Sequence, residues 1–215
     1  MTINYKTEQE GFWAGQFGDD YVKRNQGAAI VAGNLALFGK VLARTAGVRS
    51  ALEFGANIGM NLAALRALVP GIELSAIEIN DTAVASLKQQ GDIKVHAQSI
   101  LEFAPDRKHD LVLIKGVLIH MNPDCLAQVY DLLYASSARY ICVAEYYNPS
   151  PVELSYRGNS QRLFKRDFAG EMLDRFADLR LVDYGFRYHR DRNFPQDDIT
   201  WFLLEKCDAG LPLAA

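Results

Sequence analysis

The sequence has little of what marks several common classes of protein. Its three cysteines, Cys125, Cys142 and Cys207, are far apart and form no CxxC pair, which argues against a disulfide framework and a thiolate zinc site. We expect no bound metal. No apolar run approaches the roughly 20 residues that a membrane-spanning helix needs, so no membrane association is expected. The formal net charge of -3 also argues against a nucleic-acid binder, because phosphate contacts need clustered cations.

Signals for export and for several domains are missing as well. Residues 1–6 lack the basic and then apolar pattern of a signal peptide, and dispersed cysteines fit a cytoplasmic protein. No internal repeat or low-complexity linker interrupts the 215 residues. We therefore expect one domain over 1–215, with an N-terminal helical segment over 1–46, a core over 47–207 and a tail over 208–215. The oligomeric state stays open, a homodimer included.

What the sequence does contain is an alternation of short apolar runs with longer stretches of helical period. Such alternation predicts βαβ units and a parallel sheet. We expect helices over about 8–24, 28–45, 61–68, 81–90, 123–136 and 165–176, and strands over about 51–54, 73–79, 93–96, 110–114, 140–144, 179–188 and 199–205. Residues 146–164 are expected to form a long irregular loop.

The last two predicted strands follow each other without a helix between them. A plain dinucleotide-binding domain would add another parallel strand through a helix, whereas strand, loop and strand predict an antiparallel hairpin. We therefore predict an α/β, doubly wound, Rossmann-like fold with a seven-stranded, mostly parallel sheet and a C-terminal antiparallel hairpin. This ending is typical of S-adenosylmethionine-dependent methyltransferases.

The turn after the first predicted strand has the most specific local pattern, which runs Glu53-Phe54-Gly55-Ala56-Asn57-Ile58-Gly59-Met60-Asn61. Gly55 permits a positive φ, and Gly59 opens a helix whose free N–H groups carry partial positive charge. The middle glycine of nicotinamide-binding loops is absent, so a pyrophosphate fits poorly. Glu53 would repel a pyrophosphate but suits the ammonium of S-adenosyl-L-methionine. Asn57 and Asn61 are expected cofactor contacts from the same loop.

The ends of the next two strands complete the expected cofactor site. Glu78 follows Gly55 by 23 positions, close to the spacing at which an acidic residue binds a ribose. After the third strand, Ser99 or a neighbouring amide is expected to bond the edge of the adenine. Ile79 and Ile100 are expected to enclose the adenine ring.

Residues after the fourth and fifth strands are candidates for the chemistry. A hydroxyl acceptor needs a general base, and His120 follows the fourth strand at the edge where such sheets bind ligands. The stretch after the fifth strand is rich in cations, and arginine suits planar or tetrahedral anions. We therefore expect a small anionic acceptor, bound by Tyr146, Tyr147, Arg157, Lys165 and Arg166.

With these features in place, the chain resembles class I S-adenosylmethionine-dependent methyltransferases over nearly its whole length. Segments 12–25 (FWAGQFGDDYVKRN), 115–121 (KGVLIHM) and 145–149 (EYYNP) resemble the pseudaminic acid biosynthesis-associated methylases, a group similar to phosphonate O-methyltransferases. The resemblance implies that the N-terminal helix is a lid over the cofactor. It adds Trp13, Arg24 and Lys115 to the expected cofactor contacts and Tyr21 to the acceptor contacts.

The expected function is O-methylation of a small anionic metabolite, such as a nine-carbon sugar acid or a phosphonate, with S-adenosyl-L-homocysteine as the product. Two alternatives stay open. One is a nicotinamide-dependent oxidoreductase, and the other is a non-catalytic, cofactor-binding partner of another enzyme. The sequence does not name the acceptor or the atom that is methylated.

Overall fold

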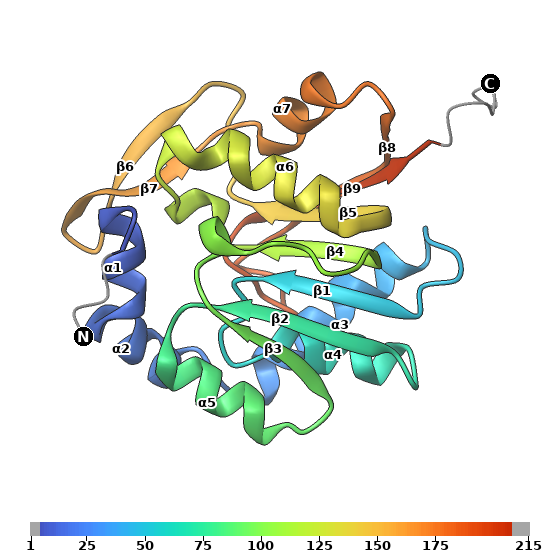
Figure 1. Cartoon of the computed structure of the whole chain (residues 1–215), viewed down its shortest axis with the longest axis horizontal. Coiled ribbons are helices and arrows are strands. Elements are labelled where there is room, and N and C mark those ends of the chain that lie inside the picture. Colours follow the sequence, from blue (N-terminus) through green and yellow to red (C-terminus); the bar gives the residue numbers. More distant parts are fainter. Residues whose placement is uncertain (1–4, 208–215) are drawn as a thin grey trace.

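A seven-stranded sheet lies at the centre of the computed structural model, which describes residues 5–207 (Figure 1). The tail predicted over 208–215 lies outside the described residues. The strands run in the order β3-β2-β1-β4-β5-β9-β8. Their bounds are β1 Ser50–Phe54, β2 Glu73–Glu78, β3 Ile93–Ala97, β4 His109–Lys115, β5 Ser137–Glu145, β8 Leu179–Arg187 and β9 Ile199–Lys206.

The pairing of these strands confirms the predicted architecture. Strands β1 to β5 are parallel to their neighbours, β9 is antiparallel to β5, and β8 is antiparallel to β9. The strand order reverses between β1 and β4. In an open α/β sheet, the crevice outside the carboxyl ends of the strands at such a reversal is where ligands bind.

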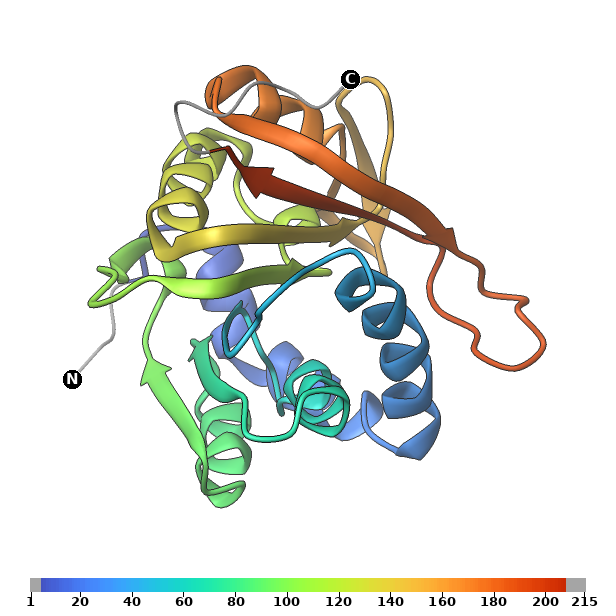
Figure 2. The same cartoon turned by 90° about the vertical axis from the view of Figure 1, so that its right-hand side faces the viewer.

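Helices cover both faces of the sheet (Figure 2). One apolar cluster joins the sheet to α3 (Ala28–Leu42), α4 (Met60–Leu68) and α5 (Asp81–Gln89). The other joins it to α6 (Leu126–Ser136) and α7 (Phe168–Arg175). Because the central strands are buried on both faces, their sequences are continuous apolar runs rather than alternating ones.

Three short 3-10 helices, η1 (Ile100–Glu102), η2 (Leu118–His120) and η3 (Pro123–Cys125), complete the connections. Both η1 and η2 follow directly after strands at the carboxyl edge of the sheet. No helix in the described part of the chain is long and apolar enough to cross a bilayer.

The helix predicted over 8–24 is in fact two helices, α1 (Glu8–Ala14) and α2 (Gln16–Arg24), separated by Gly15. The helical period continues across the break, so the sequence pattern conceals it. Gly18 permits the bend, because a Cβ at this position would lie 1.8 Å from the carbonyl oxygen of Trp13. The start of α2 therefore packs directly against the backbone at the end of α1.

The prediction of an irregular loop over 146–164 is wrong. This stretch contains β6 (Val152–Tyr156) and β7 (Asn159–Lys165), which form a separate two-stranded antiparallel hairpin. The residues of β6 (VELSY) do alternate between apolar and polar, but the run is only five residues long and mostly exposed, and β7 (NSQRLFK) does not alternate. The two turn residues, Arg157 and Gly158, both have positive φ, as tight hairpin turns require.

The start of the helix predicted over 165–176 is also wrong, because Lys165 ends β7. The helix α7 begins at Phe168, after Asp167, whose side chain accepts a hydrogen bond from the amide of Gly170 at 2.8 Å.

We predict that Gly18→Ala destabilises the protein by about 1–3 kcal/mol, because the added methyl group overlaps the Trp13 carbonyl. Gly39→Ala in α3 is the matched control. Its Cβ would meet nothing within 4 Å, and alanine is the better helix former, so stability should rise by about 0.5–1 kcal/mol. Urea unfolding measures both values. Equal effects of the two substitutions would contradict the close packing of α2 on α1.

Candidate active site

A cavity of about 330 Å³ opens at the carboxyl ends of β1, β2, β3 and β4. This volume is within the range of small-molecule sites. Side chains of α1 and α2 form its roof, and the loop between β8 and β9 contributes one wall. Among the site residues predicted from sequence, those that line the cavity are Trp13, Tyr21, Gly55, Asn57, Asn61, Glu78, Ile79, Ser99, Ile100, Lys115 and His120.

The loop after β1 has the strained backbone that the sequence indicates. Gly55, Asn57 and Gly59 have φ values of 72°, 48° and 78°, all in the left-handed region. A Cβ on Gly55 would also lie 2.7 Å from a methyl group of Val117. Glycine is therefore needed at position 55 both for the backbone conformation and for the close approach of the segment after β4.

The carboxylate of Glu78 fixes the shape of this loop. One oxygen, Oε2, accepts a hydrogen bond from the amide of Asn57 at 2.7 Å. The other, Oε1, accepts from the amides of Ile79 and Asn80, both at 2.8 Å. Burial raises the pKa of Glu78, and these amide bonds oppose the shift. A carboxylate has about four acceptor positions, so one remains on Oε2 at the cavity.

Glu53 does not line the cavity and lies behind Asn61. The side-chain amide of Asn61 donates to Oε1 of Glu53 at 2.6 Å, and Oε2 has no hydrogen-bond partner. The carboxyl group is fully buried, and this burial raises its pKa to about 8, while Lys115 acts in the opposite direction. The structure thus places Asn61 where the sequence predicted Glu53 to meet the cofactor.

At the end of the cavity formed by the segment after β3, the hydroxyl of Ser99 already has two partners. It donates to the carboxylate of Glu10 and accepts from the amide of Leu101 at 2.9 Å. Ser99 is the N-cap of η1, which explains this use of its side chain. Sequence reasoning missed Glu10, although Thr7 and Glu10 form a capping box that fixes the start of α1.

His120 lies in η2 between two aromatic rings. Its ring centroid is 4.7 Å from that of Trp13 and 4.7 Å from that of Tyr156. Nδ1 lies 2.5 Å from the carbonyl oxygen of Arg162, which can only accept, so Nδ1 carries the hydrogen and Nε2 is left as an acceptor. Burial lowers the pKa of His120 to about 4, which keeps the imidazole neutral at ordinary pH.

The β6–β7 hairpin packs against the roof and supports this arrangement. The side-chain amide of Gln9 donates to the carbonyl of Gln161 at 3.1 Å, and Arg162 forms an ion pair with Glu8 at 3.3 Å. Arg162 also lies over the ring of Phe12 at 5.2 Å. The segment that sequence reasoning treated as a loop thus holds both the roof and His120.

Eight predicted site residues do not line the cavity, namely Arg24, Glu53, Gly59, Tyr146, Tyr147, Arg157, Lys165 and Arg166. Tyr147 and Arg166 line a separate small hollow, where Arg166 forms an ion pair with Glu171 at 2.8 Å. Successive side chains of an extended chain point in opposite directions, so Tyr146 and Tyr147 cannot both face one site. Arg24 is exposed and lies over the rings of Phe17 and Tyr21, at 5.3 and 5.9 Å.

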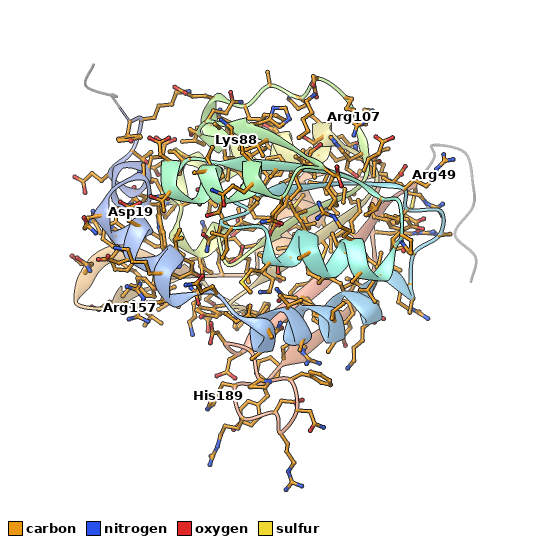
Figure 3. All side chains as sticks on the ribbon, turned by 90° about the horizontal axis from the view of Figure 1, so that it is seen from below. Asp19, Arg49, Lys88, Arg107, Arg157 and His189 are labelled. Atoms are coloured by element: carbon orange, nitrogen blue, oxygen red, sulfur yellow. The ribbon has the colours of Figure 1, made fainter. Side chains whose placement is uncertain are left out.

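Other predicted cations gather near the tyrosines beside the cavity. Lys115 lines the cavity at the end of β4, Lys165 lies 5.1 Å from the ring of Tyr146, and Arg157 lies 5.9 Å from the ring of Tyr156. Within residues 5–207, none of these three cations has a carboxylate within 4.0 Å. Figure 3 shows Arg157 at the margin of the molecule on the side of α2, which carries Asp19.

The loop between β8 and β9 supplies cavity residues that the sequence did not indicate. Pro195, Gln196 and Asp197 line the cavity, and the side-chain amide of Gln196 donates to Oδ1 of Asn34 in α3 at 3.0 Å. These residues were missed because only the long-range contact between the loop and α3 brings them to the site. His189, in the same loop, instead forms an ion pair with Asp198 at 2.8 Å and projects from the body (Figure 3).

The other histidines lie away from the cavity. His109 is buried at the amino end of β4, where it is 3.1 Å from the hydroxyl of Ser75. His96 packs beside Phe103 at a centroid distance of 5.0 Å. No group of three or more potential metal ligands occurs in the part of the chain that the structure describes.

No protein-family model matches the chain, and no curated protein matches it. Solved structures do. A Burkholderia thailandensis 1,6-didemethyltoxoflavin-N1-methyltransferase with bound S-adenosylhomocysteine is similar at 17% identity and a TM-score of 0.68, over 93% of this chain and 87% of that one. Magnesium protoporphyrin IX methyltransferase from Synechocystis PCC 6803 is similar at 15% identity and a TM-score of 0.66, over 94% of this chain and 100% of that one. DhpI in complex with S-adenosylhomocysteine is similar at 16% identity and a TM-score of 0.58, over 93% of each chain.

These likenesses define the fold. Counting the strands of the main sheet alone, the order is 3-2-1-4-5-7-6 with antiparallel strands at the C-terminal end, which is the class I methyltransferase arrangement. The chain therefore shares the fold of these S-adenosylmethionine-dependent methyltransferases. The similar structures bind S-adenosylmethionine or S-adenosylhomocysteine and belong to enzymes that act on diverse small molecules.

The buried carboxyl group of Glu53 predicts a dependence of stability on pH. Between pH 4.5 and about 8 the native state keeps a proton that the unfolded chain has lost, so stability should fall as the pH rises. One such proton gives a slope of about 1.4 kcal/mol per pH unit. Glu53→Gln should remove this contribution to the slope. The contribution of Glu145 should remain, because burial raises the pKa of Glu145 to about 7.

Urea unfolding of the ligand-free protein between pH 5 and 8 measures the slope. The exposed Glu73, changed to Gln, is the control and should behave like the wild type. An unchanged slope in Glu53→Gln would show that Glu53 does not keep its proton in the native state.

Proposed function

We propose that the chain is an S-adenosylmethionine-dependent methyltransferase that transfers a methyl group to an oxygen of a small anionic acceptor. The observation that carries the proposal is the left-handed loop after β1, held by Glu78 at the crevice between β1 and β4. A pyrophosphate would meet the carboxylate of Glu78 at this loop. An adenosyl amino acid brings hydroxyl and ammonium donors instead.

The residues of the cavity fit the parts of such a cofactor in order. Ile79 and Ile100 offer apolar surface for the adenine, and Oε2 of Glu78 has an acceptor position left for a ribose hydroxyl. Oδ1 of Asn61 has no hydrogen-bond partner among the residues that the structure describes, which suits an ammonium group nearby. When bound, the cofactor supplies the methyl group as an activated sulfonium.

The unpaired cations near the tyrosines support an anionic acceptor. Within residues 5–207, Arg157 and Lys165 have no carboxylate within 4.0 Å, whereas Arg162 and Arg166 form ion pairs with Glu8 and Glu171. A cation without a counter-charge beside a partly enclosed cavity is stabilised when a ligand brings an anion. The hydroxyl of Tyr21, which burial keeps protonated by raising its pKa, is a further donor at this end.

His120 is placed to receive a proton from the acceptor. Because Nδ1 donates to the Arg162 carbonyl, Nε2 is the basic atom, and the low pKa leaves it unprotonated at pH 7. The rings of Trp13 and Tyr156 exclude water and fix the plane of the imidazole. A methyl acceptor that is already ionised at the attacking oxygen needs no base, and His120 and the two rings then serve only to orient it.

Calorimetry tests the cofactor half of the proposal. We predict that S-adenosylhomocysteine binds in the micromolar range, roughly -8 kcal/mol, and that NAD does not bind. Glu78→Gln should weaken S-adenosylhomocysteine at least about tenfold through loss of a charged acceptor. Exposed Glu73→Gln should leave the affinity unchanged. Tight binding of NAD, or no binding of S-adenosylhomocysteine, would refute the proposal.

His120→Ala should lower kcat by about 10²–10⁴-fold without changing the affinity for S-adenosylhomocysteine, because His120 acts on the acceptor. The assay is a screen for release of S-adenosylhomocysteine with small hydroxycarboxylates and hydroxyphosphonates, whose attacking hydroxyl group needs a base. The wild-type rate should decline only as the pH falls towards about 4, where His120 becomes protonated. A variant with wild-type kcat would remove His120 from proton transfer.

A further inference from the structure

The loop between β8 and β9 carries an unpaired acidic group into the end of the cavity that the acceptor should occupy. The loop is held in place by several bonds, among them Gln196 to Asn34 at 3.0 Å and the guanidinium of Arg187 to the carbonyl of Phe194 at 3.0 Å. Asp197 lines the cavity beside Gln196. Its position is thus built into the fold.

Asp197 has no hydrogen bond and no ion pair within residues 5–207, although it lies among titratable groups. With burial, its charge raises the pKa values of Tyr21 and Tyr146. It also opposes the lowering of the pKa of Lys115 by burial. Asp197 and Lys115 therefore share one end of the cavity without reaching each other within 4.0 Å.

A role for Asp197 as the counter-charge of Lys115 does not explain this placement. Lys115 already has two buried carboxyl groups near it, Glu53 and Glu145, on the neighbouring strands β1 and β5. A third acidic group, Asp197, is exposed on a separate loop and lines the cavity, where it can meet a ligand. For an acceptor that is only an anion, Asp197 is a repulsive neighbour.

Taking the proposed function as given, we propose that the acceptor is zwitterionic and that Asp197 binds its ammonium group while Arg157 and Lys165 bind its anion. The oxygens that the loop between β8 and β9 presents to the cavity, which accept hydrogen bonds, agree with that chemistry. A carboxylate only accepts hydrogen bonds, and the side-chain oxygen of Gln196 has no partner. An ammonium group supplies three N–H donors to these oxygens and replaces the repulsion by attraction.

Two small phosphonates that differ only in an amine test the inference. The protein is saturated with S-adenosylhomocysteine and titrated by calorimetry with 3-aminopropylphosphonate and with propylphosphonate. The amine should bind about tenfold more tightly, as expected for one charge-assisted contact. In Asp197→Asn the two phosphonates should bind equally.

Asp198→Asn is the matched control, because Asp198 pairs with His189 and does not line the cavity. This variant should keep the full preference for the amine. Lys165→Met should weaken both phosphonates alike, since it removes a cation that the anion needs.

Three results separate the inference from the function on which it rests. Equal binding of the two phosphonates to the wild type, or an intact preference in Asp197→Asn, overturns the zwitterion while leaving the methyltransferase proposal in place. Binding of S-adenosylhomocysteine without either phosphonate contradicts the anionic acceptor as well. No binding of S-adenosylhomocysteine rejects the proposed function and the inference together.

Discussion

The carboxylate of Glu78 organises the ligand-binding edge of the sheet. By accepting from the amides of Asn57, Ile79 and Asn80, it ties the loop after β1 to the turn after β2. Without it, buried amides in two adjacent turns would lose their partners, at about 1–3 kcal/mol for each. The strained φ values of Gly55, Asn57 and Gly59 persist because these contacts fix the loop. The cavity at the strand reversal is the result.

The distribution of charge divides this cavity into two functional ends. Near β1 and β2 lie buried carboxyl groups, Glu53 and Glu78, whose pKa values burial raises. Near β4 and the hairpin lie cations without ion-pair partners, joined by Asp197. A cofactor with hydroxyl and ammonium groups suits the first end, and an acceptor with an anionic group suits the second. The neutral His120 lies between the roof and the hairpin, where we propose that it accepts a proton from a hydroxyl acceptor.

Local patterns predicted the sheet and the cofactor loop because their causes are local. Buried strands need apolar runs, and the turn after β1 needs glycine at position 55, so both are visible in one sequence. The hairpin of β6 and β7 was missed because the alternating run in β6 is short and β7 has no periodic pattern. The break at Gly15 was missed because the helical period runs through it.

The acceptor site was less predictable, since long-range packing decides it. Tyr146 and Tyr147 are adjacent in sequence, yet Tyr147 lines a different hollow. Arg157, Lys165 and Arg166 form one basic stretch, but Glu171 neutralises Arg166. Asp197 reaches the cavity only because its loop folds back onto α3. Which side chains meet a ligand depends on those contacts, and no spacing along the chain records them.

A crystal structure of the chain grown with S-adenosylhomocysteine tests the central claim most directly. The account predicts the adenine between Ile79 and Ile100, a ribose hydroxyl on Oε2 of Glu78, and the amino-acid end towards Asn61 and Lys115. Electron density for the ligand on another surface, or a cavity that stays free of it at saturating concentration, would contradict the account.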